Sequence, residues 1–381
     1  MQDVCVVVPT IREFGCVRDY VANAREHGFD TDRLHVVLVT EDHCPTEEMR
    51  EMLRDLGVEG AVFDGRARSA WLADRDVAAY DHLIPARSHA QTSFGLLYLW
   101  AEGFDYGVFL DDDTRPHEGR DFFGRHLANL GPTAGLETRT SDERWVNVLE
   151  DVPYDLYPRG YPYAAMDETE TRRRSDEADV VASQGLWTDV PDLDAARILA
   201  DGDLRGQSTV RLSADDYGDD FLVAPGDYLT VCSMNLAFRR EVVPAFYQFP
   251  MDDNEWGVGR FDDIWSGVLL KRACDVLGRG VRSGAPLCHH HKAPRSTFDD
   301  LAAETAALEL NEHLWRVVDD AGDDAETFAD VARAAAGALV EAGDEDWRNA
   351  AFLAQCGEYL ADWVDCLDHL APARAGADRQ I

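Results

Sequence analysis

The stretch of sequence that decides the fold is Tyr106-Gly-Val-Phe-Leu-Asp-Asp-Asp113. Its mostly apolar first part predicts a short buried strand, and an aspartate triplet follows that strand directly. Open α/β sheets bind their ligands at the carboxyl ends of their strands. The triplet is therefore expected at the edge of such a sheet, where a ligand would meet it.

The segments before this strand alternate between apolar runs that predict strands and periodic stretches that predict helices. In chain order these predicted elements lie at 4–8, 17–27, 36–39, 46–56, 61–63 and 88–100. Such alternation is typical of a parallel α/β sheet. The loops 9–12 and 40–45 would then lie at the same edge of the sheet as the aspartate triplet.

The chain after the triplet changes character twice. Residues 166–180 are crowded with charge, which predicts an exposed loop or insertion. From 298 to 381 apolar residues recur at helical spacing, and these helical faces either pack on the body of the protein or form an oligomer interface. We therefore expect a domain over 1–297, with halves at about 1–130 and 131–297, followed by a helical region.

Composition excludes several classes of function. Asp and Glu number 73 against 36 Lys and Arg, a formal net charge of -37. Such a surface repels phosphate backbones and anionic membranes, so nucleic acid is not expected as a partner. The only lysines are Lys271 and Lys292, and this acid excess with little lysine is expected of a halophile-type protein. No apolar run or signal pattern indicates membrane insertion or export, so a cytoplasmic protein is expected.

Two clusters suggest a divalent cation and a phosphate. Adjacent carboxylates at Asp111 to Asp113 repel one another unless a cation neutralises them, and hard oxygen ligands suit Mg²⁺ or Mn²⁺. The alternative is an acidic turn in an acidic protein. In Cys288-His-His-His-Lys292, neighbouring histidines in a strand point to opposite faces, so only alternate ones can face one metal. Lys292 is expected to contact a phosphate, and a solvated polar loop is the alternative.

A carboxylate pair stands in Gly259-Arg-Phe-Asp-Asp-Ile-Trp265, before a predicted helix over 264–270. The favoured interpretation is that one of Asp262 and Asp263 caps this helix. The alternative interpretation is that the pair acts as a base or binds sugar hydroxyls. The sequence has no Gly-x-Gly-x-x-Gly after a strand and no Walker loop. Neither NAD nor flavin is therefore expected as a cofactor.

Seven segments in the same order resemble the reversibly glycosylated polypeptides, which are UDP-arabinopyranose mutases also known as UDP-forming α-1,4-glucan-protein synthases. The segments are 8–12, 109–113, 159–162, 183–187 with 191–195, 232–238, 259–265 and 290–293. The resemblance implies a Rossmann-like nucleotide-sugar fold of the glycosyltransferase A type, with UDP held on Mn²⁺ or Mg²⁺. The domain over 1–297 would then bind the nucleotide in its first half and the sugar in its second.

The resemblance also implies roles for single residues. Asp113 and His290 would be the metal ligands. The loop Thr40-Glu-Asp-His43 differs from the family's Gln-Asp-Gly-Asp, and in this chain Glu41 or Asp42 would accept the hydrogen bond from uracil. The family's helix at this place carries an arginine that faces the nucleotide. Residues 90–93 have no arginine, so Arg87 would replace it. The residues expected around the nucleotide are Thr10, Arg12, Glu41, Asp42, Arg87, Asp111 and Asp112.

On the sugar side, Arg159 matches the arginine that the family glycosylates on itself, and Asp262 and Asp263 match a pair in the sugar region. With Lys292 at the diphosphate, these are the expected catalytic residues. The side chain of Trp187 either forms an apolar platform for one face of the sugar or is buried in the core.

The implied activity is flavin-free isomerisation of a UDP-sugar such as UDP-arabinose between its pyranose and furanose forms. The alternatives are a transferase that glycosylates itself or another acceptor, and a noncatalytic scaffold subunit of a mutase complex. A homo-oligomer is an open alternative for the assembly.

Overall fold

The computed structural model describes residues 3–11, 14–166 and 171–370. Its strands are β1 (Val4–Pro9), β2 (Leu34–Val39), β3 (Glu59–Phe63), β4 (Tyr106–Leu110), β5 (Thr114–Pro116), β6 (Gly131–Ser141), β7 (Trp145–Val146), β8 (Thr171–Asp189), β9 (Phe221–Val223), β10 (Tyr228–Leu229), β11 (Asn235–Arg239) and β12 (Arg279–His290). Its α-helices are α1 (Cys16–Glu26), α2 (Thr46–Leu56), α3 (Gly65–Ala73), α4 (Thr92–Glu102), α5 (Phe122–Asn129), α6 (Ala195–Asp201), α7 (Asp262–Val276), α8 (Thr297–Asp319), α9 (Phe328–Ala342) and α10 (Ala350–His369).

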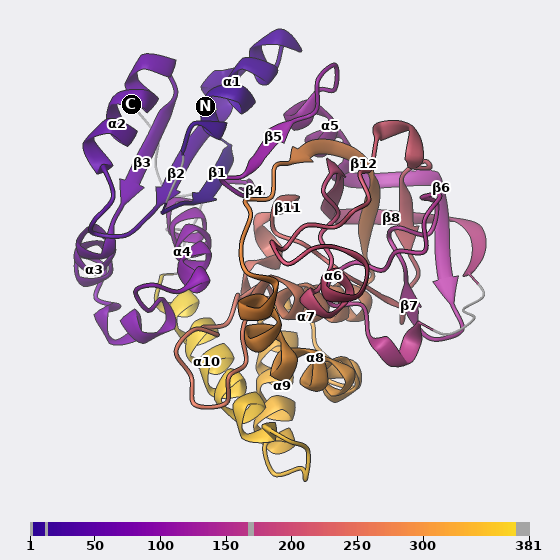
Figure 1. Ribbon diagram of the computed structural model, residues 1–381. Coiled ribbons are helices and arrows are strands. Elements are labelled where there is room, and N and C mark those ends of the chain that lie inside the picture. The colour runs from indigo at the N-terminus through magenta and orange to yellow at the C-terminus, as the bar shows by residue number, and fades with distance from the viewer. Residues whose placement is uncertain (1–2, 12–13, 167–170, 371–381) are drawn as a thin grey trace.

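Within the described residues, ten strands form one mixed sheet in the order β3-β2-β1-β4-β11-β8-β6-β9-β12-β5 (Figure 1). The strands β3, β2, β1 and β4 are parallel, and β11 then pairs antiparallel with β4. The carboxyl ends of β1, β2 and β4 therefore lie at one edge, as expected, and the aspartate triplet follows β4 there. The expected α/β class with C-terminal helices is confirmed.

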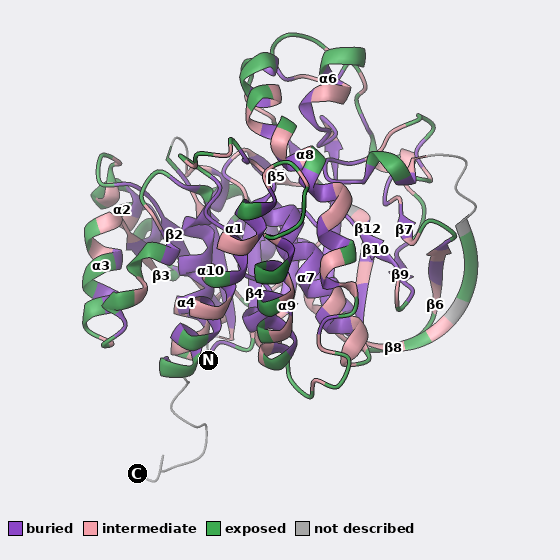
Figure 2. Ribbon diagram, turned by 90° about the horizontal axis from the view of Figure 1, so that it is seen from below, coloured by how far each residue is buried: buried purple, intermediate pink, exposed green. Residues whose placement is uncertain are grey.

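Alternation along β1 separates the two faces of the sheet. Val4, Val6 and Val8 pack with apolar side chains of α1, α2 and α5, whereas Cys5 and Val7 pack with those of α3 and α4. All of these β1 side chains are at most 2% exposed. Figure 2 shows the consequence, buried strands in the middle and helices whose outer sides are exposed.

The predicted helices and strands of the N-terminal half are present, and α3 is an element that the sequence analysis missed. It is short and begins where the carboxylate of Asp64 accepts a hydrogen bond from the backbone N–H of Ala67 at 2.8 Å. Its sequence, GRARSAWLA, carries few apolar residues at helical spacing, so periodicity gave little signal.

The expectation of an exposed loop over 166–180 is wrong from Thr171 onward, and residues 167–170 lie outside the described part. The segment is the first half of β8, which pairs antiparallel with β6 along 171–180. Opposite charges accompany this pairing, because Arg173 donates to the carboxylate of Asp151 at 2.9 Å. The charges that suggested a loop are therefore carried by a paired strand, whose Arg172, Arg173 and Arg174 side chains are exposed.

The apolar faces of the C-terminal helices pack on the body of the same chain. The indole of Trp363 in α10 stacks on Tyr247 with ring centroids 4.8 Å apart and donates to the carbonyl of Val243 at 3.2 Å. Trp100 of α4 donates to the carbonyl of Leu367 at 3.1 Å. Of the two interpretations of these faces, packing on the core is therefore confirmed. Among the described helices, none is long and apolar enough to cross a membrane.

Candidate active site

Polar side chains from three loops meet at the carboxyl edge of the parallel strands. Thr10 follows β1, and its hydroxyl donates to Oδ2 of Asp112 at 2.8 Å, with both residues buried. Thr40 follows β2 and donates from its hydroxyl to the carbonyl of Thr10 at 2.6 Å. The structure thus brings Thr10 and Asp112 together, and their expected role at the nucleotide stays a prediction.

The loop after β2 is held by its own chain. Oε1 of Glu41 accepts hydrogen bonds from the side-chain amide of Gln91 and from the backbone N–H of Arg87. Oδ1 of Asp42 accepts from the backbone N–H of Arg66 at 3.1 Å. The side chain of Arg87 is exposed on a residue with a positive φ of 60°. The predicted nucleotide residue Arg12 lies outside the described residues.

The aspartate triplet is an unfavourable place for negative charge. Burial raises the pKa of Asp111 to about 8, and the carboxylates of Asp113 and Asp263 add to this increase, while the charge of His89 opposes it. Asp263 belongs to α7, so the triplet and the carboxylate pair of α7 interact electrostatically across one site. A cation placed between them would relieve their repulsion.

His290 and Asp113 are the expected metal ligands, and their surroundings fit that role. Buried His290 pairs with Thr114 in the β12–β5 ladder, next to Asp113, while His289 and His291 alternate to the other face. Nδ1 of His290 lies 2.8 Å from the carbonyl of Val190, which orients the ring and leaves Nε2 for a ligand. Cys288, His289 and His290 are thus part of a strand and not the solvated loop of the alternative interpretation, whereas His291 and Lys292 follow that strand.

Within the described part of the chain, no three His, Cys, Asp or Glu side chains are arranged to hold a metal ion. Mg²⁺ and similar hard cations are commonly bound by one or two protein carboxylates together with substrate phosphates and water. A carboxylate from Asp113 and an imidazole from His290 fit such a shared site for Mn²⁺ or Mg²⁺.

Arg159 is the centre of the buried charge network on the sugar side. It is 8% exposed, and its guanidinium donates to both carboxylate oxygens of Asp263 at 3.3 and 3.2 Å, to Asp192 at 3.1 Å, and to the carbonyl of Arg260. These acidic neighbours raise the pKa of Arg159 well above its usual range, although burial acts against them. The guanidinium is therefore a permanent cation with its donors engaged.

Gly160 lets Arg159 approach α7. Its φ is +90°, and a Cβ built there would lie 2.3 Å from Cγ2 of Ile264, so the turn at 159–160 requires glycine. Helix α8 holds the same turn from the other side, because Asn311 donates to the carbonyl of Gly160 at 2.8 Å. Glu304 of α8 also accepts from Nε of Arg260 at 2.7 Å. The C-terminal helical region thus positions the Arg159 segment.

Asp192 connects Arg159 with the metal-side strand. The charges of Arg159, Lys292 and His290 lower the pKa of Asp192 to about 2, although burial acts in the opposite direction. Burial lowers the pKa of Lys292, whose ammonium interacts with Asp192. Lys292 therefore interacts with Asp192, and its expected contact with a phosphate stays a prediction. Trp187 is 1% exposed, which favours the core interpretation of this residue.

The capping interpretation of the α7 carboxylates is wrong. The N-cap is Phe261, without a side-chain hydrogen bond, and both aspartates lie in the first turn. Asp263 accepts from the backbone N–H of Ile264 at 3.0 Å within that turn but also binds Arg159, and Oδ2 of Asp262 lies 2.6 Å from Nδ1 of His89. Ion pairing with groups far away in sequence outweighs capping here.

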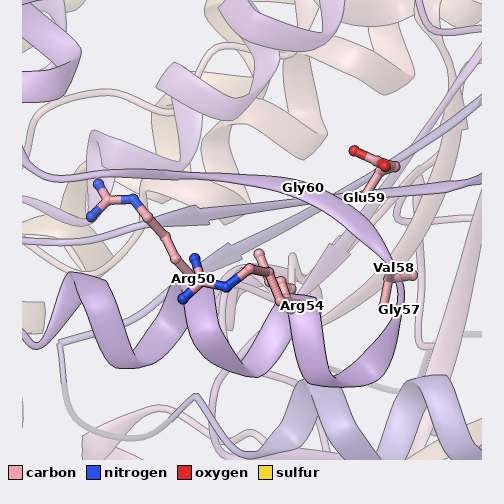
Figure 3. A pocket seen from close by; sticks show the side chains of 7 residues that line it. Arg50, Arg54, Gly57, Val58, Glu59 and Gly60 are labelled. Atoms are coloured by element: carbon pink, nitrogen blue, oxygen red, sulfur yellow. The ribbon is translucent and has the colours of Figure 1, made fainter.

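One groove of the described surface lies away from this site. It has a volume of about 440 Å³ and lies between the end of α2 and the start of β3, lined by Arg50, Leu53, Arg54, Gly57, Val58, Glu59 and Gly60 (Figure 3). This is the amino end of β3, opposite to the carboxyl ends of the strands. Arg54 is already bonded to Glu47 at 3.0 Å, and Arg50 to the hydroxyl of Thr46 at 3.2 Å.

The sequence analysis missed two residues of the site. His89 precedes α4 and had no spacing signal, because its partner Asp262 is distant in the chain. Asp192 belongs to segment 191–195, which carried the family resemblance, but it received no role. Its position in that segment was the available signal.

Comparison with known proteins decides the family. The model of the family described as reversibly glycosylated polypeptide matches residues 134–369. The chain belongs to this family.

Similar members of the reversibly glycosylated polypeptide family come from plants. Probable UDP-arabinopyranose mutase 1 of Pisum sativum is 37% identical over 215 residues, which are 55% of this chain and 51% of that protein. UDP-arabinopyranose mutase 1 of Oryza sativa subsp. japonica is 28% identical over 284 residues, 72% of this chain and 70% of that protein. The match to the pea relative thus spans about half of that protein's length.

Solved structures with a similar fold are glycosyltransferases. A mannosyltransferase from Pyrobaculum calidifontis in complex with GDP-mannose and Mn²⁺ has 16% identity and a TM-score of 0.35, covering 97% of this chain and 84% of that one. S. aureus TarS in complex with UDP-GlcNAc has 11% identity and a TM-score of 0.36, covering 96% of this chain and 89% of that one.

Proposed function

We propose that the chain is a metal-dependent UDP-sugar mutase, which interconverts the pyranose and furanose forms of a sugar such as arabinose. The observation that carries the proposal is that polar side chains from distant segments meet in pairs: Thr10 donates to Asp112 at 2.8 Å, and Nδ1 of His89 lies 2.6 Å from Oδ2 of Asp262 in α7. We assign the first pair to the nucleotide and the carboxylates of α7 to the sugar. Membership of the reversibly glycosylated polypeptide family and the names of its plant members support this assignment.

The proposed substrate lies along the carboxyl edge of the sheet. The nucleoside would lie against the loops that carry Thr10 and Glu41, and the sugar against Asp262 and Asp263. Asp113 and His290 would hold Mn²⁺ or Mg²⁺, which when bound neutralises charge on the diphosphate. Lys292 would bind the same diphosphate from the end of β12.

Isomerisation exchanges the sugar hydroxyl oxygen that closes the ring on the anomeric carbon. The bond from that carbon to UDP breaks, and the UDP oxygen keeps the bonding electrons. The hydroxyl oxygen of the new ring bonds to the carbon and loses its proton, the bond from the carbon to the old ring oxygen breaks, and the old ring oxygen takes up a proton. The UDP oxygen then bonds to the same carbon again, so no group is lost or gained. The chain's part is to keep UDP and the sugar together and exclude water between these steps. The buried carboxylates of α7 would orient the sugar hydroxyls by accepting their hydrogen bonds.

Arg159 has the properties of a fixed cation in this scheme. A protonated guanidinium has no lone pair with which to attack the anomeric carbon, and its donors are engaged by Asp263, Asp192 and the Arg260 carbonyl. We therefore propose that Arg159 keeps the two carboxylates in place and that the sugar is not carried on it. A mutase of this kind differs from the self-glycosylating alternative, in which the sugar would be bonded to Arg159.

The test is incubation with UDP-arabinopyranose and Mn²⁺ in concentrated KCl, followed by chromatography of the nucleotide sugars, with Asp113→Ala as the inactive control. UDP-arabinofuranose without free UDP supports the mutase. Free UDP together with a glycosylated protein supports the transferase. Absence of turnover with a panel of UDP-sugars, despite UDP binding, supports the scaffold.

A further inference from the structure

A histidine lies between the two groups of carboxylates in the candidate site. His89 begins a short 3₁₀ turn, η3 (His89–Gln91), directly before α4. Its ring Nδ1 lies 2.6 Å from Oδ2 of Asp262, and its backbone N–H donates to Oδ2 of Asp252 at 3.1 Å. Both the ring and the backbone of His89 are therefore held in position.

The same histidine remains open to a ligand. Its side chain is 44% exposed, whereas that of Asp262 is 7% exposed. Because Nδ1 faces Asp262, the nitrogen available to another group is Nε2. Within the described residues, Nε2 of His89 has no hydrogen-bond partner.

The surroundings keep this ring positively charged. Although desolvation acts in the opposite direction, the carboxylate of Asp262, with Asp111 and Asp263, raises the pKa of His89 to about 10. Both ring nitrogens then carry a proton, so Nε2 is a charged donor. A charged donor that is fixed on one side and open on the other favours an anionic ligand. The anionic part of a UDP-sugar is its diphosphate.

We propose that His89 is a substrate-binding residue, which donates a hydrogen bond from Nε2 to a diphosphate oxygen of the nucleotide sugar. Asp262 is its positioning residue, because it orients the ring through Nδ1. This inference rests on the proposed function, since it assumes that a nucleotide diphosphate occupies the site. It gives Asp262 a role beside the sugar contact that the sequence analysis expected.

The test compares the affinities of UDP and UDP-arabinopyranose by calorimetry in the presence of Mn²⁺, for the full chain and for His89→Gln. A matched control is His82→Gln, because His82 forms a similar pair with Asp362 at 2.9 Å, is 42% exposed, and lies outside the site. We expect His89→Gln to weaken both ligands equally, by about tenfold, and His82→Gln to leave both affinities within about twofold.

Each other result has a definite meaning. Loss of affinity for UDP-arabinopyranose alone overturns the diphosphate contact, because it places His89 at the sugar. Unchanged affinity for both ligands overturns the inference altogether. If the unmodified chain binds no UDP, the proposed function itself is wrong. Asp252→Ala provides a second variant, which removes the acceptor of the His89 backbone N–H but keeps the His89 ring, and a smaller loss of affinity for both ligands is expected from it.

Discussion

Arg159 and Asp263 form an ion pair with two parallel hydrogen bonds, from Nη1 to Oδ1 at 3.3 Å and from Nη2 to Oδ2 at 3.2 Å. The two residues are far apart in the sequence, and both are buried. Asp192 shares the same guanidinium at 3.1 Å. One buried arginine thus holds two carboxylates that would otherwise repel each other.

Replacing Arg159 by alanine should destabilise the protein strongly. The change leaves Asp263 and Asp192 buried without their cation, and breaking buried pairs in this way costs about 3–5 kcal/mol. Urea unfolding followed by circular dichroism measures the loss. The control is Arg172→Ala, which breaks the exposed pair with Asp142 and should cost about 0–1 kcal/mol. Equal, small losses in both variants would contradict the structural role of Arg159.

Replacing Asp113 by alanine should remove the metal dependence of UDP binding and leave the fold intact. Asp113 is half-buried, and the hydrogen bond that it accepts from the His291 backbone at 2.9 Å uses its carbonyl, which the substitution keeps. Calorimetry of UDP binding with and without Mn²⁺ checks this, with exposed Asp346→Ala as the control. UDP binding that still responds to Mn²⁺ in the variant would refute the ligand assignment.

The pair of His89 and Asp262 should make stability depend on pH at alkaline values. His89 has a pKa of about 10 in the folded protein against an ordinary value of 6.5, so its contribution is fully present below about pH 6.5. The contribution is lost as the pH rises through about 10, where the ring loses its proton.

The difference in unfolding free energy between the unmodified chain and His89→Gln isolates this contribution from other titrating groups. That difference should decrease steadily between pH 6.5 and 10. A difference that stays constant over this range would show that His89 is not charged in the folded state.

The acidic composition should make thermal stability increase with salt. With a formal net charge of -37, repulsion between surface carboxylates opposes folding at low ionic strength, and salt screens it. We expect the Tm to increase between about 0.1 M and about 2 M KCl, over which the Debye length falls from about 10 Å to below about 3 Å. A Tm that stays constant or decreases over this range would contradict the expectation of a halophile-type protein.

The sequence predicted the parts of the fold that depend on local pattern. The strand at 106–110 and its triplet, the parallel order before it and the C-terminal helical faces all follow from periodicity. The first half of β8 was misassigned because its pairing with β6 is not local, and neither is the bond from Arg173 to Asp151. Contacts between distant segments determine that strand.

The same distinction applies to the candidate site. Family resemblance pointed to Arg159, Asp263 and Lys292, which the structure places in one region. The resemblance did not point to His89, because residue 89 lies outside the segments that carry it. The residue that orients His89, Asp262, is distant in the chain, so no local spacing indicates the pair. The support that α8 gives to Gly160 likewise depends on packing, which no local motif reveals.

The most direct test of the account is to start from UDP-arabinopyranose and, separately, from UDP-arabinofuranose, with Mn²⁺ present, and to measure the final ratio of the two. A mutase must reach the same ratio from both sides, with UDP remaining bonded to sugar. We predict that result. Accumulation of free UDP in proportion to the lost substrate, with no interconversion of the two UDP-sugars, would contradict the account.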